Sequence, residues 1–277
     1  MAPVPIRRVP VADGVSLHAR VWDDRSADWP SFLLVHGLSS NCRTFEAVAE
    51  RLHAEGHPVA TLDLRGHGQS DKPDTGYDFA TLSSDLSTAI VALGLERPVV
   101  VGQSTGGNLA VELAHRASER VAGVVGIDGG VIDLQARWPH WDDCEAALAP
   151  PSFNGIPVAD FEAMIHRHHP DWSAWGVEAT AANCEVLADG AVRPWLTRDR
   201  HLRILRALWE HRPFGLLPLG VPTLLLFAKP SEAEDARALA ALAALGDKVR
   251  IEVLPGDHDL HVQQPDRVAD LLLETCG

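Results

Sequence analysis

The fold of this chain is decided at residues 99–107, which read Val-Val-Val-Gly-Gln-Ser-Thr-Gly-Gly. Three β-branched residues lead directly into a Gly-x-Ser-x-Gly pattern, and a helical pattern follows. The pentapeptide alone is typical of any glycine-rich turn between a strand and a helix. With strand and helix on either side it matches a nucleophile elbow, whose sharp turn leaves the serine hydroxyl exposed at its tip. The stretch therefore predicts that Ser104 is a catalytic nucleophile.

The composition is that of a globular protein with an acidic balance. Of the 277 residues, 46% are hydrophobic, which argues against a disordered chain. The 24 Lys and Arg residues against 38 Asp and Glu residues leave a formal net charge of −14. Such a charge argues against nucleic acid or an anionic membrane as the main partner. The sequence does not indicate an oligomeric state.

Three features predict a cytoplasmic location. The N-terminal residues lack the apolar segment of a secretory signal. No apolar run approaches the roughly 20 residues that are needed to span a bilayer. The four cysteines show no paired spacing, as expected for free thiols in a reducing compartment: Cys42, Cys144, Cys184 and Cys276.

Apolar runs alternate with helical patterns along most of the chain. Strands are predicted at residues 15–22, 32–35, 59–64, 98–101, 121–127, 222–227 and 249–254. Helical patterns fill the intervals; a capping box at residues 231–234 predicts one helix, and the last begins near Asp266. This alternation predicts an α/β protein with a parallel sheet and helices on both faces. Functional residues are then expected beyond the carboxyl ends of the strands.

The alternation is interrupted between residues 131 and 215, a segment with six of the eight tryptophans. Its short helical patterns, prolines and histidines predict an inserted helical cap over the active edge of the sheet. Residues 1–130 and 216–277 would then form the core. Each tryptophan is expected to pack within the cap, but as a group they also favour an apolar substrate pocket. The candidate substrate-binding residues are Trp138, Trp141, Trp172 and Trp175.

A nucleophilic serine needs a histidine base, which in turn needs an orienting acid. His258 is the best candidate, because its Gly-Asp-His turn directly follows the last predicted strand. His261, three residues later, is expected to have a packing role. The neighbouring His166, His168 and His169 lack the spacing of a metal-binding helix, and we expect them to be solvated cap residues. No metal or cofactor is predicted.

Together with the elbow, three further segments resemble the α/β-hydrolase superfamily, in the subgroup with a lidded core, over essentially the whole chain. They are His36-Gly37-Leu38, Asp63-Leu64-Arg65-Gly66-His67-Gly68-Gln69-Ser70, and Gly256-Asp257-His258 with Gln264-Pro265 following. The resemblance implies the α/β-hydrolase fold, with an oxyanion hole formed by the backbone N–H groups of Leu38 and Thr105. It also implies that residues 63–70 shape the loop beside the site. Asp63 and Arg65 are expected to be members of structural ion pairs.

The triad acid is absent from the position that is commonest in this family. That position follows the strand at residues 222–227, where this chain has Ala228-Lys229-Pro230-Ser231. The nearby Glu232, Glu234 and Asp235 fit helix capping and dipole compensation better.

Asp128 is the better placed carboxylate. It ends the strand after the elbow helix, 24 residues beyond Ser104, and two glycines follow it. Its alternative interpretation is a turn residue before those glycines. The arrangement resembles haloalkane dehalogenases and the lactonase that opens zearalenone, which take their acid from the end of the same strand. Because the order Ser104, Asp128, His258 is also that of the fold, we expect these residues to form the triad.

The identity of the residue at the elbow, a serine, narrows the range of reactions. Haloalkane dehalogenases and epoxide hydrolases of this fold use an aspartate at the elbow, whereas a serine favours acyl transfer. The sequence therefore predicts a serine hydrolase, free of cofactors, for a carboxylic ester or lactone of a bulky apolar small molecule. Alternatives are a carbon–carbon bond hydrolase or thioesterase of secondary metabolism, and a relative that binds ligands without turnover.

Overall fold

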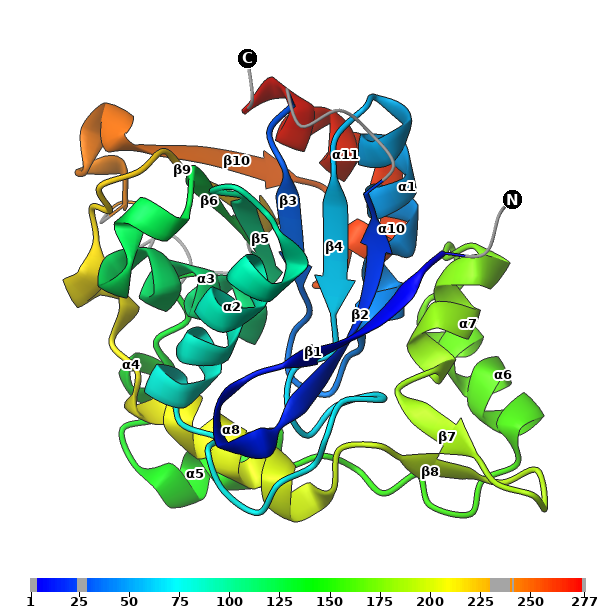
Figure 1. Ribbon diagram of the computed structural model, residues 1–277. Helices are drawn as coiled ribbons and strands as arrows, with labels where there is room; N and C mark the ends of the chain where they lie inside the picture. The colour runs from blue at the N-terminus through cyan, green and yellow to red at the C-terminus, as the bar shows by residue number, and fades with distance from the viewer. Residues whose placement is uncertain (1–3, 24–28, 230–239, 241, 276–277) are drawn as a thin grey trace.

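A sheet of eight strands, in the order β1-β2-β4-β3-β5-β6-β9-β10, organises the computed structural model, which describes residues 4–23, 29–229, 240 and 242–275 (Figure 1). The strands β1 and β2 form an antiparallel hairpin, and β2 also pairs antiparallel with β4. The remaining pairs are parallel. The strands are β1 (Ile6–Pro10), β2 (Ser16–Trp22), β3 (Phe32–Val35), β4 (Val59–Leu62), β5 (Val99–Gln103), β6 (Gly123–Ile127), β9 (Thr223–Ala228) and β10 (Val249–Leu254).

Helices cover both faces of the sheet, which explains why its central strands are continuous apolar runs. Along β5, Val100 packs into one hydrophobic cluster, while Val99 and Val101 pack into the cluster on the opposite face. Two helices, α2 (Phe79–Leu93) and α3 (Thr105–Arg116), contribute to the first cluster. The second includes residues of α1 (Glu46–Ala54), α10 (Leu260–Gln263) and α11 (Pro265–Glu274). The predicted α/β class, a mostly parallel sheet covered on both faces, is confirmed.

The segment between β6 and β9, for which a cap was predicted, lies beyond the carboxyl ends of the strands (Figure 1). It contains a two-stranded hairpin that the sequence did not suggest. Its elements are α4 (Leu134–Arg137), α5 (Trp141–Leu148), α6 (Val158–His168), α7 (Ala174–Ala181), β7 (Cys184–Val186), β8 (Val192–Pro194) and α8 (Arg198–Glu210). The helices α6 and α7 form a small core of their own, which Val262 of α10 joins. This segment is called the cap below.

Short 3-10 turns complete the chain, and most predicted elements have their counterparts in the structure. These turns are η1 (Ala12–Gly14), η2 (Cys42–Phe45), η3 (Ser118–Arg120), η4 (Pro213–Leu216) and η5 (Gly246–Lys248). The strand predicted from Val121 begins only at Gly123. The capping box predicted at residues 231–234 lies outside the described residues.

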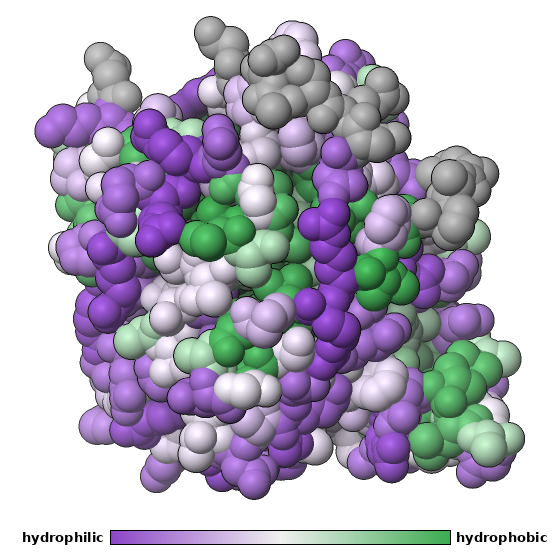
Figure 2. Space-filling model, viewed as in Figure 1, coloured by the Kyte–Doolittle hydropathy of each residue, from purple (hydrophilic) through white to green (hydrophobic). Residues whose placement is uncertain are grey.

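The surface is mostly hydrophilic, as the charge balance suggests, with isolated apolar patches (Figure 2). One patch lies over the β7–β8 hairpin, where Val186 is 56% exposed. Among the described helices, none has the length and apolarity to cross a membrane.

Candidate active site

Ser104 lies between β5 and α3 in a backbone conformation that non-glycine residues rarely adopt, with φ 52° and ψ −122°. Such strain costs on the order of 1–3 kcal/mol and persists only where surrounding structure enforces it. Here the Ser104 N–H donates to the Ile127 carbonyl at 2.9 Å, and the Gly107 N–H donates to the Ser104 carbonyl at 2.9 Å. A Cβ atom at Gly102 would overlap the backbone of Gly106, so this turn requires glycine.

His258 and Asp128 come together at the same edge of the sheet. His258, in the loop between β10 and α10, places its Nδ1 2.5 Å from Oδ2 of Asp128. The other carboxylate oxygen accepts the Ala228 N–H at 3.1 Å, so Asp128 is fixed from two sides. Because Nδ1–H donates to the carboxylate, Nε2 of His258 is left as the free base.

Close backbone packing joins this pair to the elbow. The side-chain amide of Gln103 donates to the His258 carbonyl at 3.1 Å. A Cβ atom at Gly129, directly after Asp128, would overlap the backbone of Ser104. The ends of β5 and β6 and the loop after β10 therefore meet around the Ser104 backbone.

Carboxylates surround the imidazole of His258. Burial alone would lower its pKa, but the hydrogen bond that His258 donates to Asp128 and the charges of Asp259, Asp128 and Asp257 outweigh burial, and the pKa lies above its ordinary value. Burial also raises the pKa of Asp259. This field favours an imidazolium, the form that a histidine base takes in the transition state of acyl transfer.

The predicted oxyanion donors lie in the turn after β3 (Leu38) and at the first residue of α3 (Thr105). Within the described part of the chain, the backbone N–H groups of Leu38 and Thr105 donate to no protein acceptor. The turn after β3 lies against the nucleophile, since a Cβ atom at Gly37 would be 3.0 Å from Cβ of Ser104. Two unpaired donors beside a strained serine are what stabilisation of a tetrahedral intermediate needs.

A family model described as the α/β hydrolase fold matches residues 30–265. This chain belongs to the α/β-hydrolase fold family. It is 28% identical over 239 residues to 2-(acetamidomethylene)succinate hydrolase of Mesorhizobium japonicum, covering 86% of this chain and 84% of that protein.

Solved structures of the α/β-hydrolase fold superimpose on almost the whole chain. A crystal structure of E-2-(acetamidomethylene)succinate hydrolase has a TM-score of 0.84 and 26% identity, and the match covers 98% of each chain. The thioesterase domain of the curacin biosynthetic pathway has a TM-score of 0.78 at 20% identity, covering 98% of this chain and 99% of the domain. The second likeness shows the shared fold alone.

In this α/β-hydrolase fold, the four predicted substrate-binding tryptophans lie in different environments. Trp138 and Trp141 pack beside α8, where Nε1 of Trp209 donates to the Trp138 carbonyl at 2.7 Å. Trp172 is buried and its Nε1 donates at 3.1 Å to Oδ2 of Asp257, the residue before His258. Trp175 is half-buried on α7. A substrate contact stays a prediction for each of them.

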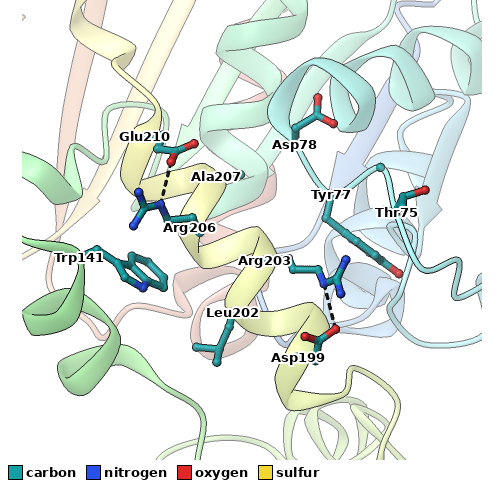
Figure 3. A pocket seen from close by; sticks show the side chains of 11 residues that line it. Thr75, Tyr77, Asp78, Trp141, Asp199, Leu202, Arg203, Arg206, Ala207 and Glu210 are labelled. Carbon is teal, nitrogen blue, oxygen red and sulfur yellow. Dashed lines mark hydrogen bonds and ion pairs between the residues drawn. The ribbon is translucent and has the colours of Figure 1, made fainter.

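An open groove of about 580 Å³ runs along the outer side of α8, and Trp141 and Tyr77 line it (Figure 3). Its arginines are paired along the helix, Arg203 with Asp199 at 2.9 Å and Arg206 with Glu210 at 2.7 Å. No triad residue lines this groove, so it is separate from the candidate site.

Asp63 and His169 differ from their predicted roles. Asp63 forms no ion pair with another described residue but accepts the backbone N–H groups of Cys42 at 2.7 Å and Gln69 at 2.8 Å. Asp63 also lies with Cys42 and His18 in the one set of side chains with metal-ligand spacing among the described residues. His169, predicted to be solvated, lies with its Nδ1 3.0 Å from Oδ2 of Asp257.

Sequence reasoning did not identify Asp257 or His201 as neighbours of the site. Because Asp257 directly precedes His258, its place in the sequence could have indicated that it lies beside the site. His201 lies in α8 and reaches the turn after β3 only because the cap folds back over the sheet. No local pattern indicates that contact.

Proposed function

We propose that the protein is a serine hydrolase that cleaves a carboxylic ester or lactone of a bulky apolar small molecule, without a cofactor. The observation that carries this proposal is the 2.5 Å hydrogen bond between His258 and Asp128 at the edge that holds Ser104. We further propose that it acts in the cytoplasm, with neither nucleic acid nor a membrane as partner.

The reaction follows from the roles of these groups. Oγ of Ser104 attacks the substrate carbonyl carbon while Nε2 of His258 takes its proton, and Leu38 and Thr105 donate to the oxyanion. Collapse of the intermediate breaks the bond to the alcohol oxygen, which receives that proton and leaves. Water then attacks the acyl-enzyme with His258 as base, and the acid and free Ser104 are released. Asp128 holds the imidazole tautomer and stabilises the imidazolium.

The tryptophans of the cap support an apolar substrate. A thioester or a carbon–carbon bond beside a ketone would use the same groups, and these substrates remain alternatives. A second candidate is the removal of an acyl group from the nitrogen of a carboxylate-bearing compound. It is favoured by the likeness, over 86% of this chain, to a hydrolase named for 2-(acetamidomethylene)succinate.

The test begins with Ser104→Ala. This variant is expected to lose turnover of p-nitrophenyl butyrate and labelling by a fluorophosphonate probe, while Ser118→Ala, exposed in η3, keeps both. A panel of an aryl ester, a lactone, a thioester, a β-diketone and an N-acetyl enamide dicarboxylate then ranks the substrate classes by kcat/KM. Labelling that persists in Ser104→Ala would refute the nucleophile, and slow acylation without release would favour a binding protein.

A further inference from the structure

The turn that carries the proposed oxyanion donor has a strained residue directly after that donor. Ser39 follows Leu38 and has φ 64°, in the left-handed region that non-glycine residues rarely occupy. Such a conformation persists only where neighbouring groups hold it. The direction of the Leu38 N–H depends on this turn, so the groups that hold Ser39 bear on the oxyanion hole.

Two buried histidines of the core bond to the turn at residues 37–39. Nδ1–H of His36 donates to the Gly37 carbonyl at 2.7 Å, because its Nε2 accepts the Leu64 N–H at 3.0 Å. Nε2 of His67 receives the Ser39 N–H at 3.4 Å. Burial lowers the pKa of both histidines, so both stay neutral with fixed tautomers.

The third histidine comes from the cap. His201, 6% exposed on α8, places Nδ1 2.7 Å from Oγ of Ser39, a residue 162 positions earlier. Its Nε2 lies 3.3 Å from the Leu148 carbonyl, which can only accept, so Nε2 carries the proton. Nδ1 is then an acceptor for the Ser39 hydroxyl. Burial lowers the pKa of His201 to about 4, which keeps this acceptor available at neutral pH.

We propose that His201 is a positioning residue that holds the Leu38 N–H in its catalytic direction through the hydroxyl of Ser39. The cap would then be part of the oxyanion hole as well as a cover for it. This inference rests on the proposed function. An oxyanion forms only after nucleophilic attack, so loss of the bond lowers kcat and leaves KM nearly unchanged.

Two substitutions at one position separate this role from packing between cap and core. In His201→Asn, the amide oxygen occupies the place of Nδ1 and keeps an acceptor for Ser39. In His201→Gln, the amide nitrogen occupies the place of Nε2 and keeps the donor to Leu148. We expect kcat for p-nitrophenyl butyrate to fall about tenfold in His201→Gln and less than threefold in His201→Asn. The loss of a whole oxyanion donor, about 10²–10³-fold, sets the upper limit.

Ser39→Ala removes the other partner of the bond at an exposed position, so it is not expected to unfold the protein. It should reproduce the loss in kcat, and Ser39→Ala with His201→Gln should lose no more than either change alone. Phenylboronic acid, which forms a tetrahedral adduct with an active-site serine, should bind about tenfold more weakly to both single variants. An adduct with unchanged affinity would mean that the bond does not act on the oxyanion hole.

The outcomes distinguish this inference from the proposed function. Equal kcat in His201→Gln and His201→Asn, an unchanged kcat in Ser39→Ala, or a loss confined to KM would overturn the positioning role. If turnover persists in Ser104→Ala, the proposed function itself fails, whatever the His201 variants do. If turnover is lost in Ser104→Ala and His201→Gln behaves as wild type, only the positioning role fails.

Discussion

Asp128 combines two properties that a triad acid needs, a fixed position and a direct bond to the base. Its carboxylate contacts both Nδ1 of His258 and the Ala228 N–H. Asp128→Asn keeps the size but replaces the acceptor with an amide that favours the wrong histidine tautomer. We expect kcat to fall about 10³–10⁴-fold with unchanged circular dichroism.

The matched control is Glu232, a carboxylate close in sequence to the position where the family more often has its acid. Glu232→Gln is expected to keep wild-type kcat, since the carboxylate bonded to His258 is that of Asp128, directly after β6. If Glu232→Gln were inactive and Asp128→Asn active, the acid would have to be reassigned.

The pH dependence of activity reports the charges around His258. Burial lowers its pKa, but the bond to Asp128 and the charges of Asp259, Asp128 and Asp257 raise it above the ordinary value of 6.5. The base must be neutral to accept a proton, so kcat/KM falls as the pH drops through this raised pKa. We therefore expect the acid limb of the kcat/KM profile to have its midpoint above pH 6.5.

Asp259→Asn provides the check on this limb. Removal of that charge should move the midpoint to lower pH, whereas Asp266→Asn, on the exposed start of α11, should leave it in place. A midpoint that stays fixed in Asp259→Asn would contradict this account of the field at the imidazole.

At the scale of elements, the sequence predicts those features that depend on residues close together in the chain. The β-branched run at β5 and the strand-end positions of Asp128 and His258 lie in short segments, and a parallel sheet brings such strand ends to one edge. The β7–β8 hairpin and the contact between His201 and Ser39 were not predicted. They depend on how the cap folds back, which joins residues up to 162 positions apart and leaves no periodic pattern.

A second contact between elements joins the cap to the histidine loop. Oδ2 of Asp257 accepts from Nε1 of Trp172 at 3.1 Å, and His169 stacks on Trp172 with ring centres 3.8 Å apart. Trp172→Phe keeps an aromatic ring there but removes one donor to the carboxylate, a bond worth roughly 1.5–3 kcal/mol. We expect faster hydrogen exchange at residues 256–259 and in the turn before α7, measured by mass spectrometry.

Trp175→Phe is the matched control, on the helix that follows the same turn. The Trp175 indole makes no hydrogen bond within the described residues, so its replacement should leave exchange at residues 256–259 unchanged. Equal exchange in both variants would mean that the bond to Asp257 does not couple cap and loop.

For the whole molecule, the cap meets the core on both sides of Ser104. Its helix α8 bonds to the turn after β3 through His201, and the segment between α6 and α7 bonds to the loop after β10 through His169 and Trp172. The first side carries the proposed oxyanion donor Leu38, and the second carries the proposed base His258. Cap docking and assembly of the catalytic groups are therefore expected to occur together.

Stability of the whole molecule depends on a buried ion pair below this cap. Arg65, in the loop after β4, binds both carboxylate oxygens of Asp85 on α2 at 2.5 and 2.7 Å, and their side chains are only 1% and 2% exposed. Arg65→Met leaves Asp85 as an uncompensated buried charge, which typically costs about 3–5 kcal/mol. At about 2–4 °C per kcal/mol, Tm should fall by about 6–20 °C in calorimetry.

Two comparisons identify the cause of that loss. The double change Arg65→Met with Asp85→Leu removes both charges, so it should recover much of the stability. Arg203→Met breaks the surface pair with Asp199, whose side chains are 49% and 71% exposed, and should cost less than about 1 kcal/mol. If the double variant were as unstable as Arg65→Met, the loss would come from packing around the long Arg65 side chain. The uncompensated charge of Asp85 on α2 would then be the minor cause.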